Sequence, residues 1–223
     1  MLEYKINIEK KNWIYRMKTK ILIISFCLFT ASAFSQEFIS DFTWNFGFTA
    51  DKLSEYIPNN SYKGFGIEGR RFFDKNISGG LSFGWNIFDQ RIAEPIIIDE
   101  EGFGGTISGT QIRYVNAFPI LANAHYYLGK RKDFRFFLGG GVGVYYILQR
   151  LDLGVWSLES NNWHFGLAPE AGFLIPFGDG ESNIIVTGKY NHAFSSGKTI
   201  GGNEDNSYSY WSLNFGFAFS SRF

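Results

Sequence analysis

The sequence of 223 residues holds 21 basic and 21 acidic side chains, is 19% aromatic and contains one cysteine. No basic patch is available for nucleic acid, and a lone cysteine excludes an intrachain disulfide bond or a cysteine-based metal site. Residues 1–35 hold six of the basic and two of the acidic residues, so the remainder has 15 basic and 19 acidic residues and a formal charge of −4. The length of this remainder predicts a single domain.

Residues 1–16 are charged, show no clear period and precede a second methionine, Met17. We predict that translation starts at Met17 and that the preceding residues are a mis-assigned extension. Two lysines then lead into the apolar run Ile21–Thr30 and the small residues Ala31-Ser-Ala33. This order is typical of a secretory signal peptide, here over residues 17–35.

Cleavage is predicted before Phe34 or before Gln36, which leaves residues 36–223 as the mature barrel domain. The alternative is an N-terminal membrane anchor, but the apolar run is shorter than the ~20 residues that a spanning helix needs. No later stretch is long and apolar enough for such a helix, so insertion into a membrane would require a closed β-barrel.

Eight segments with alternating residue types follow, each about as long as a strand that crosses a membrane. One face of each segment is apolar or aromatic, and the other face is small or polar. The segments cover residues 38–50, 63–73, 77–88, 111–128, 134–148, 163–177, 183–194 and 211–223.

The last segment shows the pattern most clearly. Trp211, Leu213 and Phe215 share one face with later phenylalanines, whereas Ser212 and Asn214 share the other. Successive side chains of a strand point to opposite faces of the sheet. The small face has no bulky group to fill a core and no charge to face water. We therefore predict that the aromatic face contacts lipid and that the small face lines a narrow lumen.

The connections between the segments alternate in length. Short connections rich in turn residues alternate with long ones; the short ones are 74–76, 129–133 and 178–182, and the long ones are 51–62, 89–110, 149–162 and 195–209. Short periplasmic turns and long external loops are typical of outer-membrane barrels. The predicted fold class is therefore all-β, an eight-stranded antiparallel up-and-down transmembrane β-barrel with both termini in the periplasm.

Pro119 and Pro169 fall inside predicted strands, where a proline removes a ladder hydrogen bond. We expect a bulge or kink at each position. The alternative is that these strands are shorter than the alternation indicates.

Four stretches resemble the "outer membrane protein beta-barrel domain" group, often labelled porin-family or PorT-like: Gly66–Phe72, Phe118–Ala124, Gly139–Tyr145 and Ala168–Phe173. The whole pattern is also similar to the superfamily of small outer-membrane barrels that includes OmpA, OmpX and OmpW. The resemblance implies insertion into the outer membrane by the barrel-assembly machinery, which reads an aromatic C-terminal strand. Here Ser221 stands where an apolar residue is usual. The residues of this assembly signal would be Phe215, Phe217, Phe219 and Phe223.

Charged residues on the inward faces are the main candidates for a site. Two pairs are expected at matching heights on adjacent strands, Glu170 with Lys189 and Asp41 with Arg70, because charges that are shielded from water should pair. His125 and Arg135 are expected near the periplasmic end. We interpret the set as a plug of salt bridges; the alternative is a charged constriction that selects a solute. The predicted polar cluster of the lumen is Asp41, Glu68, Arg70, His125, Arg135, Glu170 and Lys189.

Three other patterns are weaker. Gly64–Gly69 matches G-x-G-x-x-G, but no helical pattern follows, so a glycine-rich barrel wall is favoured over a dinucleotide site. His192 with Ser195 and Ser196 comes closest to a hydrolase arrangement, but no acid is placed to orient the histidine. Four acidic residues between positions 94 and 101 do not have EF-hand spacing, so a solvated loop tip is favoured over a Ca²⁺ site. We therefore expect no enzyme activity, no cofactor and no metal.

These patterns together predict a monomeric structural or surface-interaction protein of the outer membrane with a side-chain-filled lumen. The first alternative is a narrow pore or hydrophobic-solute conduit of OmpW type, and the second is an accessory of an outer-membrane secretion system, as the PorT-like resemblance implies. The expected partners are membrane lipid, the barrel-assembly machinery during insertion, and a surface partner that would contact the four long loops.

Overall fold

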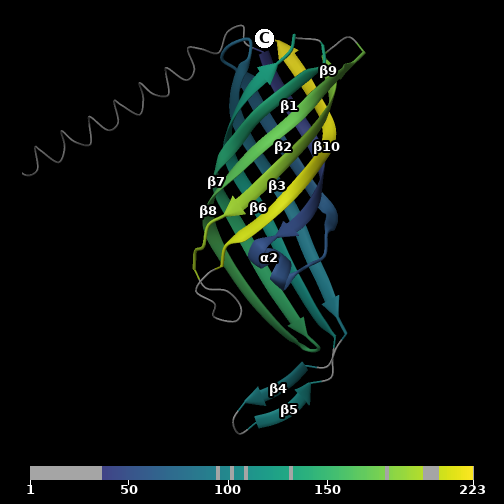
Figure 1. Cartoon of the computed structure of the whole chain (residues 1–223), viewed down its shortest axis with the longest axis vertical. Helices are drawn as coiled ribbons and strands as arrows, with labels where there is room; N and C mark the ends of the chain where they lie inside the picture. The colour runs from purple at the N-terminus through teal and green to yellow at the C-terminus, as the bar shows by residue number, and fades with distance from the viewer. Residues whose placement is uncertain are drawn as a thin grey trace, which may run out of the picture. The chain divides into compact units, whose positions relative to one another are not determined.

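The alternating segments form strands that close on one another. The computed structural model describes residues 37–93, 96–100, 103–107, 110–130, 133–178, 181–197 and 206–222. Within these residues, eight antiparallel strands form a closed barrel in the order β1-β10-β9-β8-β7-β6-β3-β2, and β4 pairs with β5 in a separate hairpin (Figure 1). The predicted eight-stranded barrel is confirmed, whereas the predicted signal peptide and Phe223 lie outside the described residues.

The elements follow the predicted segments closely at most of their ends. They are β1 (Glu37–Ala50), α2 (Asp51–Tyr56), β2 (Ser61–Phe72), β3 (Ile77–Ile92), β4 (Ile96–Glu100), β5 (Phe103–Ile107), β6 (Gln111–Leu128), β7 (Arg135–Leu153), β8 (Trp156–Phe177), β9 (Ser182–Ala193) and β10 (Tyr208–Arg222).

The two faces of the sheet have the polarity that the alternation predicts. Trp44, Phe83, Phe165 and Phe215 would form the centre of a water-soluble barrel, but their side chains are 54%, 40%, 55% and 41% exposed. Small and polar residues of the opposite parity are buried, as on β10, where Asn214 is 6% exposed. The apolar face therefore points outward and the polar face inward.

An aromatic row crosses six adjacent strands on the outer face. Its members occupy neighbouring outward positions, and those from Phe65 to Trp163 contact their neighbours ring to ring, with centroid separations of 5.7 Å for Phe65–Trp85, 5.6 Å for Trp85–Phe118 and 5.1 Å for Tyr146–Trp163. Such girdles flank the apolar band of membrane barrels. The row consists of Trp44, Phe65, Trp85, Phe118, Tyr146 and Trp163.

The prediction that residues 149–162 form a long loop is wrong. β7 and β8 continue through it and meet at a turn at Gly154, whose φ of +59° favours glycine. In Figure 1, the two strands continue past α2 toward this turn. The outward residues become polar here, so the alternation of apolar and polar residues that predicts a strand is lost. Arg150 Nε lies 2.8 Å from Asp152 Oδ1, and this hydrogen bond lowers the pKa of Asp152.

Two other predicted loops contain regular structure. Residues 51–62 include α2, and residues 89–110 include the β4–β5 hairpin and the extension of β3 to Ile92. None of the described helices is long and apolar enough to cross a membrane. Of the connection 195–209, the structure describes 195–197 and 206–209.

The sequence predicts a bulge or kink at each of the two prolines, and the strand pairing has a bulge at neither. The β3–β6 pairing is interrupted beside Pro119 and the β8–β9 pairing beside Pro169, and each resumes in the same register. On the other edge, Pro119 still pairs with Tyr145, and Pro169 with Gly140. A proline lacks only its own backbone N–H donor, which would face one edge of the strand. The strand therefore loses pairing locally on that edge and keeps it on the other edge. A register shift occurs instead in β1, between Asn45 and Gly47.

Candidate functional site

The interior of the barrel is arranged in layers along the strands. On β9, inward residues run from apolar Ile185 through Thr187, Lys189 and Asn191 to apolar Ala193. Apolar clusters from several strands lie at both ends of the interior, with the polar residues between them. The turn-end cluster is Ile39, Phe72, Tyr127, Phe137, Leu174, Ile185 and Ala218. The loop-end cluster is Leu53, Ile57, Phe88, Val115, Ala117, Leu121, Tyr145, Ile147, Ala168, Ala193, Tyr208 and Tyr210.

Glu170 is the centre of one half of the charged network. Its Oε2 atom lies 2.8 Å from Nζ of Lys189, and its Oε1 atom contacts Nε2 of His125. The Glu170 side chain is 1% exposed, and that of His125 is fully buried. Lys189 Nζ also lies 4.0 Å from Glu68 Oε2. The predicted pair of Glu170 and Lys189 on neighbouring strands is therefore a buried ion pair in the structure.

Arg70 is the centre of the other half. Its Nη2 atom donates to Asp41 Oδ2 at 2.7 Å, and its Nη1 atom donates to the Tyr127 hydroxyl at 2.8 Å. Its Nε atom lies 3.2 Å from Glu68 Oε1, which joins the two halves. The Arg70 side chain is 2% exposed. A buried guanidinium with several partners is the usual arrangement for a charge that water does not reach.

Arg135 does not belong to this network. Its guanidinium packs over the rings of Phe72 and Tyr127, with distances to the ring centroids of 5.1 and 4.4 Å, and Nη2 donates to the carbonyl of Lys75 at 3.1 Å. It lies at the turn end, as expected, whereas His125, also expected near that end, contacts Glu170 in the network. Six of the seven predicted residues therefore form one network, and Arg135 covers its turn side.

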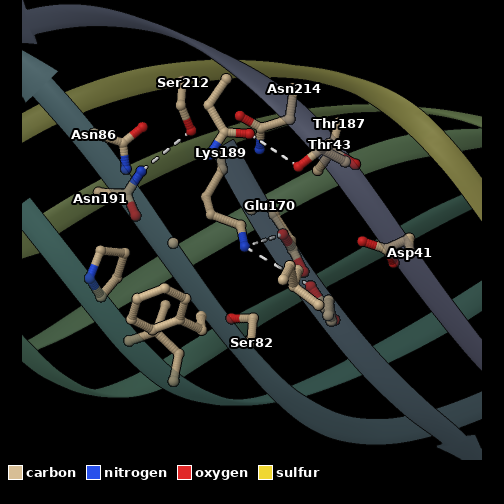
Figure 2. Close-up of a pocket in the computed structure, with 18 of the residues that line it drawn as sticks. Asp41, Thr43, Ser82, Asn86, Glu170, Thr187, Lys189, Asn191, Ser212 and Asn214 are labelled. Carbon is tan, nitrogen blue, oxygen red and sulfur yellow. Dashed lines mark hydrogen bonds and ion pairs between the residues drawn. The ribbon is translucent and has the colours of Figure 1, made fainter. Parts of the chain in front are cut away.

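A small polar cavity adjoins the network. Its volume is about 40 Å³, enough for two or three water molecules. Figure 2 shows Lys189 pointing toward Glu170, with hydroxyl and amide side chains around the pair. The predicted polar cluster of the lumen does not include these side chains, although their alternation with outward residues predicts that they face inward. They are Thr43, Ser82, Asn86, Thr187, Asn191, Ser212 and Asn214.

Gly139 makes the contact between His125 and Glu170 possible. The three residues are direct neighbours across β6, β7 and β8, with Gly139 in the middle. A Cβ atom at Gly139 would lie 2.4 Å from Cδ2 of His125 and 2.4 Å from the carbonyl oxygen of Ala124. The missing side chain therefore leaves the space that the imidazole crosses.

α2 closes the loop end of the interior. Leu53 is 2% exposed and Ile57 is fully buried, both within the loop-end cluster. Arg113 holds the helix, because its Nη1 atom donates to the carbonyl of Tyr56 at 2.9 Å and its guanidinium stacks over the Tyr56 ring. Figure 1 shows α2 at the end of the barrel opposite the arrowhead of β10.

Three donor atoms in the network lie close enough together for one metal ion. Those of Glu68, His125 and Glu170 are within 4.8 Å of one another. Arg70 and Lys189 already form ion pairs with the two carboxylates. A further cation would have to displace or oppose these positive charges, so the electrostatics favour the ion-pair network over a metal centre.

The weaker sequence patterns are placed as follows. Gly64–Gly69 lies within strand β2, in the barrel wall. His192 contacts the hydroxyl of Ser209 at 2.9 Å, whereas Ser195 donates to Asn206. The hydrolase arrangement is therefore not assembled among these residues. The side chains of the acidic stretch 94–101 lie outside the described residues.

Strand closure, outward apolar residues and a packed polar interior together decide the fold. It is that of the small eight-stranded barrels. Comparison with protein-family models finds no match, and comparison with curated proteins finds none either. The assignment rests on the strand pairing and on the polarity of the two faces.

Solved structures with a similar chain path include three small surface or barrel proteins. The Neisserial surface protein A is 13% identical, covers 84% of this chain and 97% of its own, and has a TM-score of 0.43. The N-terminal β-barrel domain of OprF from Pseudomonas aeruginosa is 12% identical, with coverages of 84% and 98% and a TM-score of 0.46. Ail, the attachment invasion locus protein of Yersinia pestis, is 14% identical, with coverages of 83% and 99% and a TM-score of 0.39.

Proposed function

We propose that this chain is an outer-membrane β-barrel that does not conduct solutes and serves as a structural or surface-interaction protein. Two features support the membrane location: the outward aromatic residues and the aromatic row across six strands. The short turns would face the periplasm. Membrane lipid and the barrel-assembly machinery would be its partners during biogenesis.

The closed interior is the observation that carries the non-conducting role. The turn-end cluster, the charged network and the loop-end cluster follow one another along the lumen, and α2 covers the last of these. The cavity between them is too small for a solute larger than a few water molecules. Eight-stranded barrels have an interior just wide enough for side chains.

We expect Trp163 to be buried in lipid and Trp156 to remain in water. Trp163 is in the aromatic row and is 58% exposed on the outer face, whereas Trp156 lies at the β7–β8 turn and is 75% exposed. Two single-tryptophan variants, with the other tryptophans changed to phenylalanine, would be folded into vesicles with brominated acyl chains. Trp163 should lose roughly half or more of its fluorescence, as expected for a residue of the aromatic girdle. Equal, weak quenching of both residues would contradict the membrane location.

In planar bilayers, we expect no stable single-channel openings from the full barrel. The Leu53→Ala variant, which shortens a side chain of the loop-end cluster, should also remain closed, because the charged network still blocks the lumen. Stable openings of the wild-type protein that disappear in Glu170→Ala or Lys189→Ala would favour the narrow-pore alternative instead. Parallel measurement of insertion by lipid quenching serves as the control.

A contact surface is proposed at the β7–β8 hairpin. Val155 is 94% exposed, Trp156 75% and Leu158 51%, and all three lie beyond the aromatic row at Trp163. An exposed tryptophan with apolar neighbours is typical of an interaction site. Co-purification of a secretion component from native membranes through this hairpin would instead favour the secretion-accessory alternative.

A further inference from the structure

Glu68 and Glu170 bring two carboxylates close together inside the barrel. One oxygen of each carboxylate and a ring nitrogen of His125 all lie within 4.8 Å of one another. Nε2 of His125 contacts Oε1 of Glu170 and lies 3.6 Å from Oε1 of Glu68, and none of the three side chains is more than 7% exposed. Two negative charges that are this close and shielded from water repel each other strongly unless a positive charge lies between them.

The network has one permanent cation fewer than it has carboxylates. Arg70 forms ion pairs with both Asp41 and Glu68. Lys189 forms its ion pair with Glu170 at 2.8 Å and lies 4.0 Å from Glu68. Three carboxylates therefore share two cations, and the network is short of one positive charge.

The other described groups around His125 do not supply this charge. Near neutral pH, its neighbours on β3, β6 and β7 are uncharged; they are Ser78, Tyr127, Phe137 and Gly139. At the turn end, Arg135 and Glu37 are both buried and add one charge of each sign. The missing positive charge therefore has to come from His125 itself, at the position between the two carboxylates.

We propose that the network holds one proton on His125, whose imidazolium bridges Glu170 and Glu68 and makes the closed interior sensitive to pH. A protonated imidazole donates from both ring nitrogens, and here Nε2 faces the two carboxylates. Nδ1 is buried and makes no hydrogen bond in the described part of the chain, and the same holds for the side-chain oxygens of Ser78 and Asn123. Ser78 is the direct neighbour of His125 on β3, and Asn123 lies two residues away on the same face of β6. This face therefore offers acceptors for the second N–H group.

The proton links the stability of the barrel to pH. A histidine in an unfolded chain binds its proton only below about pH 6.5, whereas the folded network retains the proton above that pH. The stability that the imidazolium contributes is therefore complete below about pH 6.5, and it is lost as the pH rises to the value at which the folded network releases the proton. Below about pH 5, protonation of the carboxylates acts in the opposite direction, so the useful range is about pH 6 to about pH 9. This inference rests on the closed interior and not on the membrane location.

The first test is urea-induced unfolding of the full barrel in phospholipid vesicles across this range. For the wild type, the equilibrium constant for unfolding should rise at least about tenfold from about pH 6 to about pH 9, because one proton held one pH unit more tightly changes it by that factor. His125→Gln removes the titrating ring and should lose this dependence. The matched control is His192→Gln, which changes a partly exposed histidine on β9 and should keep it.

The second test reads the proton directly and needs no change at His125. Nitrogen NMR of the barrel with isotope-labelled histidine, in detergent micelles at about pH 7.5, should show both ring nitrogens of His125 protonated. The sequence has three histidines, so His164→Gln and His192→Gln assign the signals by elimination.

Each test has a result that would overturn the proposal. A neutral His125 ring would do so, because the proton would then lie on a carboxyl group or be absent. A wild-type unfolding constant that stays the same from about pH 6 to about pH 9 would also do so, as would a pH dependence that persists in His125→Gln. None of these results depends on the tryptophan quenching that tests the membrane location.

Discussion

Replacing Glu170 with alanine is expected to destabilise the barrel by about 3–5 kcal/mol, the usual cost of removing one partner from a buried ion pair. The carboxylate accepts from Lys189 at 2.8 Å and contacts His125, and its side chain is 1% exposed. Without it, Lys189 would stay in the interior with Glu68 as its remaining acidic neighbour, 4.0 Å away. Urea-induced unfolding of the barrel in phospholipid vesicles measures the change.

Two comparisons test the physical reason for this loss. The double variant Glu170→Ala with Lys189→Met removes both charges, so it should recover part of the stability that the single variant loses. Glu159→Ala changes an exposed carboxylate 3.7 Å from Arg150 and should have little effect, as surface ion pairs usually do. A loss below about 1 kcal/mol for Glu170→Ala would show that water reaches the network.

Adding a single methyl group at Gly139 is expected to cost about 3 kcal/mol or more, or to prevent folding, because the interior cannot expand there. The new Cβ atom in Gly139→Ala would lie 2.4 Å from a ring carbon of His125 and 2.4 Å from a backbone oxygen. The imidazole would have to leave Glu170, and the β6–β7 pairing would have to shift. Unfolding in urea, together with the yield of folded barrel, measures the effect.

Gly188→Ala is the matched control for Gly139→Ala. Gly188 lies on the outer face of β9, and a Cβ atom there would meet only the carbonyl oxygen of Ala171, at 4.0 Å. Since alanine restricts the unfolded chain more than glycine does, this variant should be neutral or more stable by about 0.4–1 kcal/mol. Equal destabilisation by both variants would mean that the packing around His125 does not set the cost.

Much of the fold could be predicted because a strand has a period of two. Alternation from Trp211 to Phe219 assigns each side chain to a face, and the exposed fractions agree with that assignment. The prediction is wrong where the outward residues change from apolar to polar. Beyond Trp163, outward positions such as Glu159 are polar, so the strand resembled a loop.

The candidate site could be predicted in part. The sequence predicts the pairing of Glu170 with Lys189, because their strands are consecutive and the two residues lie at similar distances from the short turn that joins the strands. The contact of His125 with Glu170 passes over a glycine on the strand between them, and the hydrogen bond from Arg70 to Tyr127 crosses from β2 to β6. Such contacts depend on how far a side chain reaches across the lumen, which a linear pattern does not contain.

The sequence by itself determined the number of strands in the barrel, the polarity of the two faces and the outward position of the aromatic row, because these follow from local backbone geometry and hydrophobic period. Only the tertiary structure decided that Glu68 joins two groups of charges, that Arg135 remains outside them and that α2 covers the loop end. Those outcomes depend on ring closure, which brings distant strands to within a side-chain length of one another and leaves their charges to pair away from water.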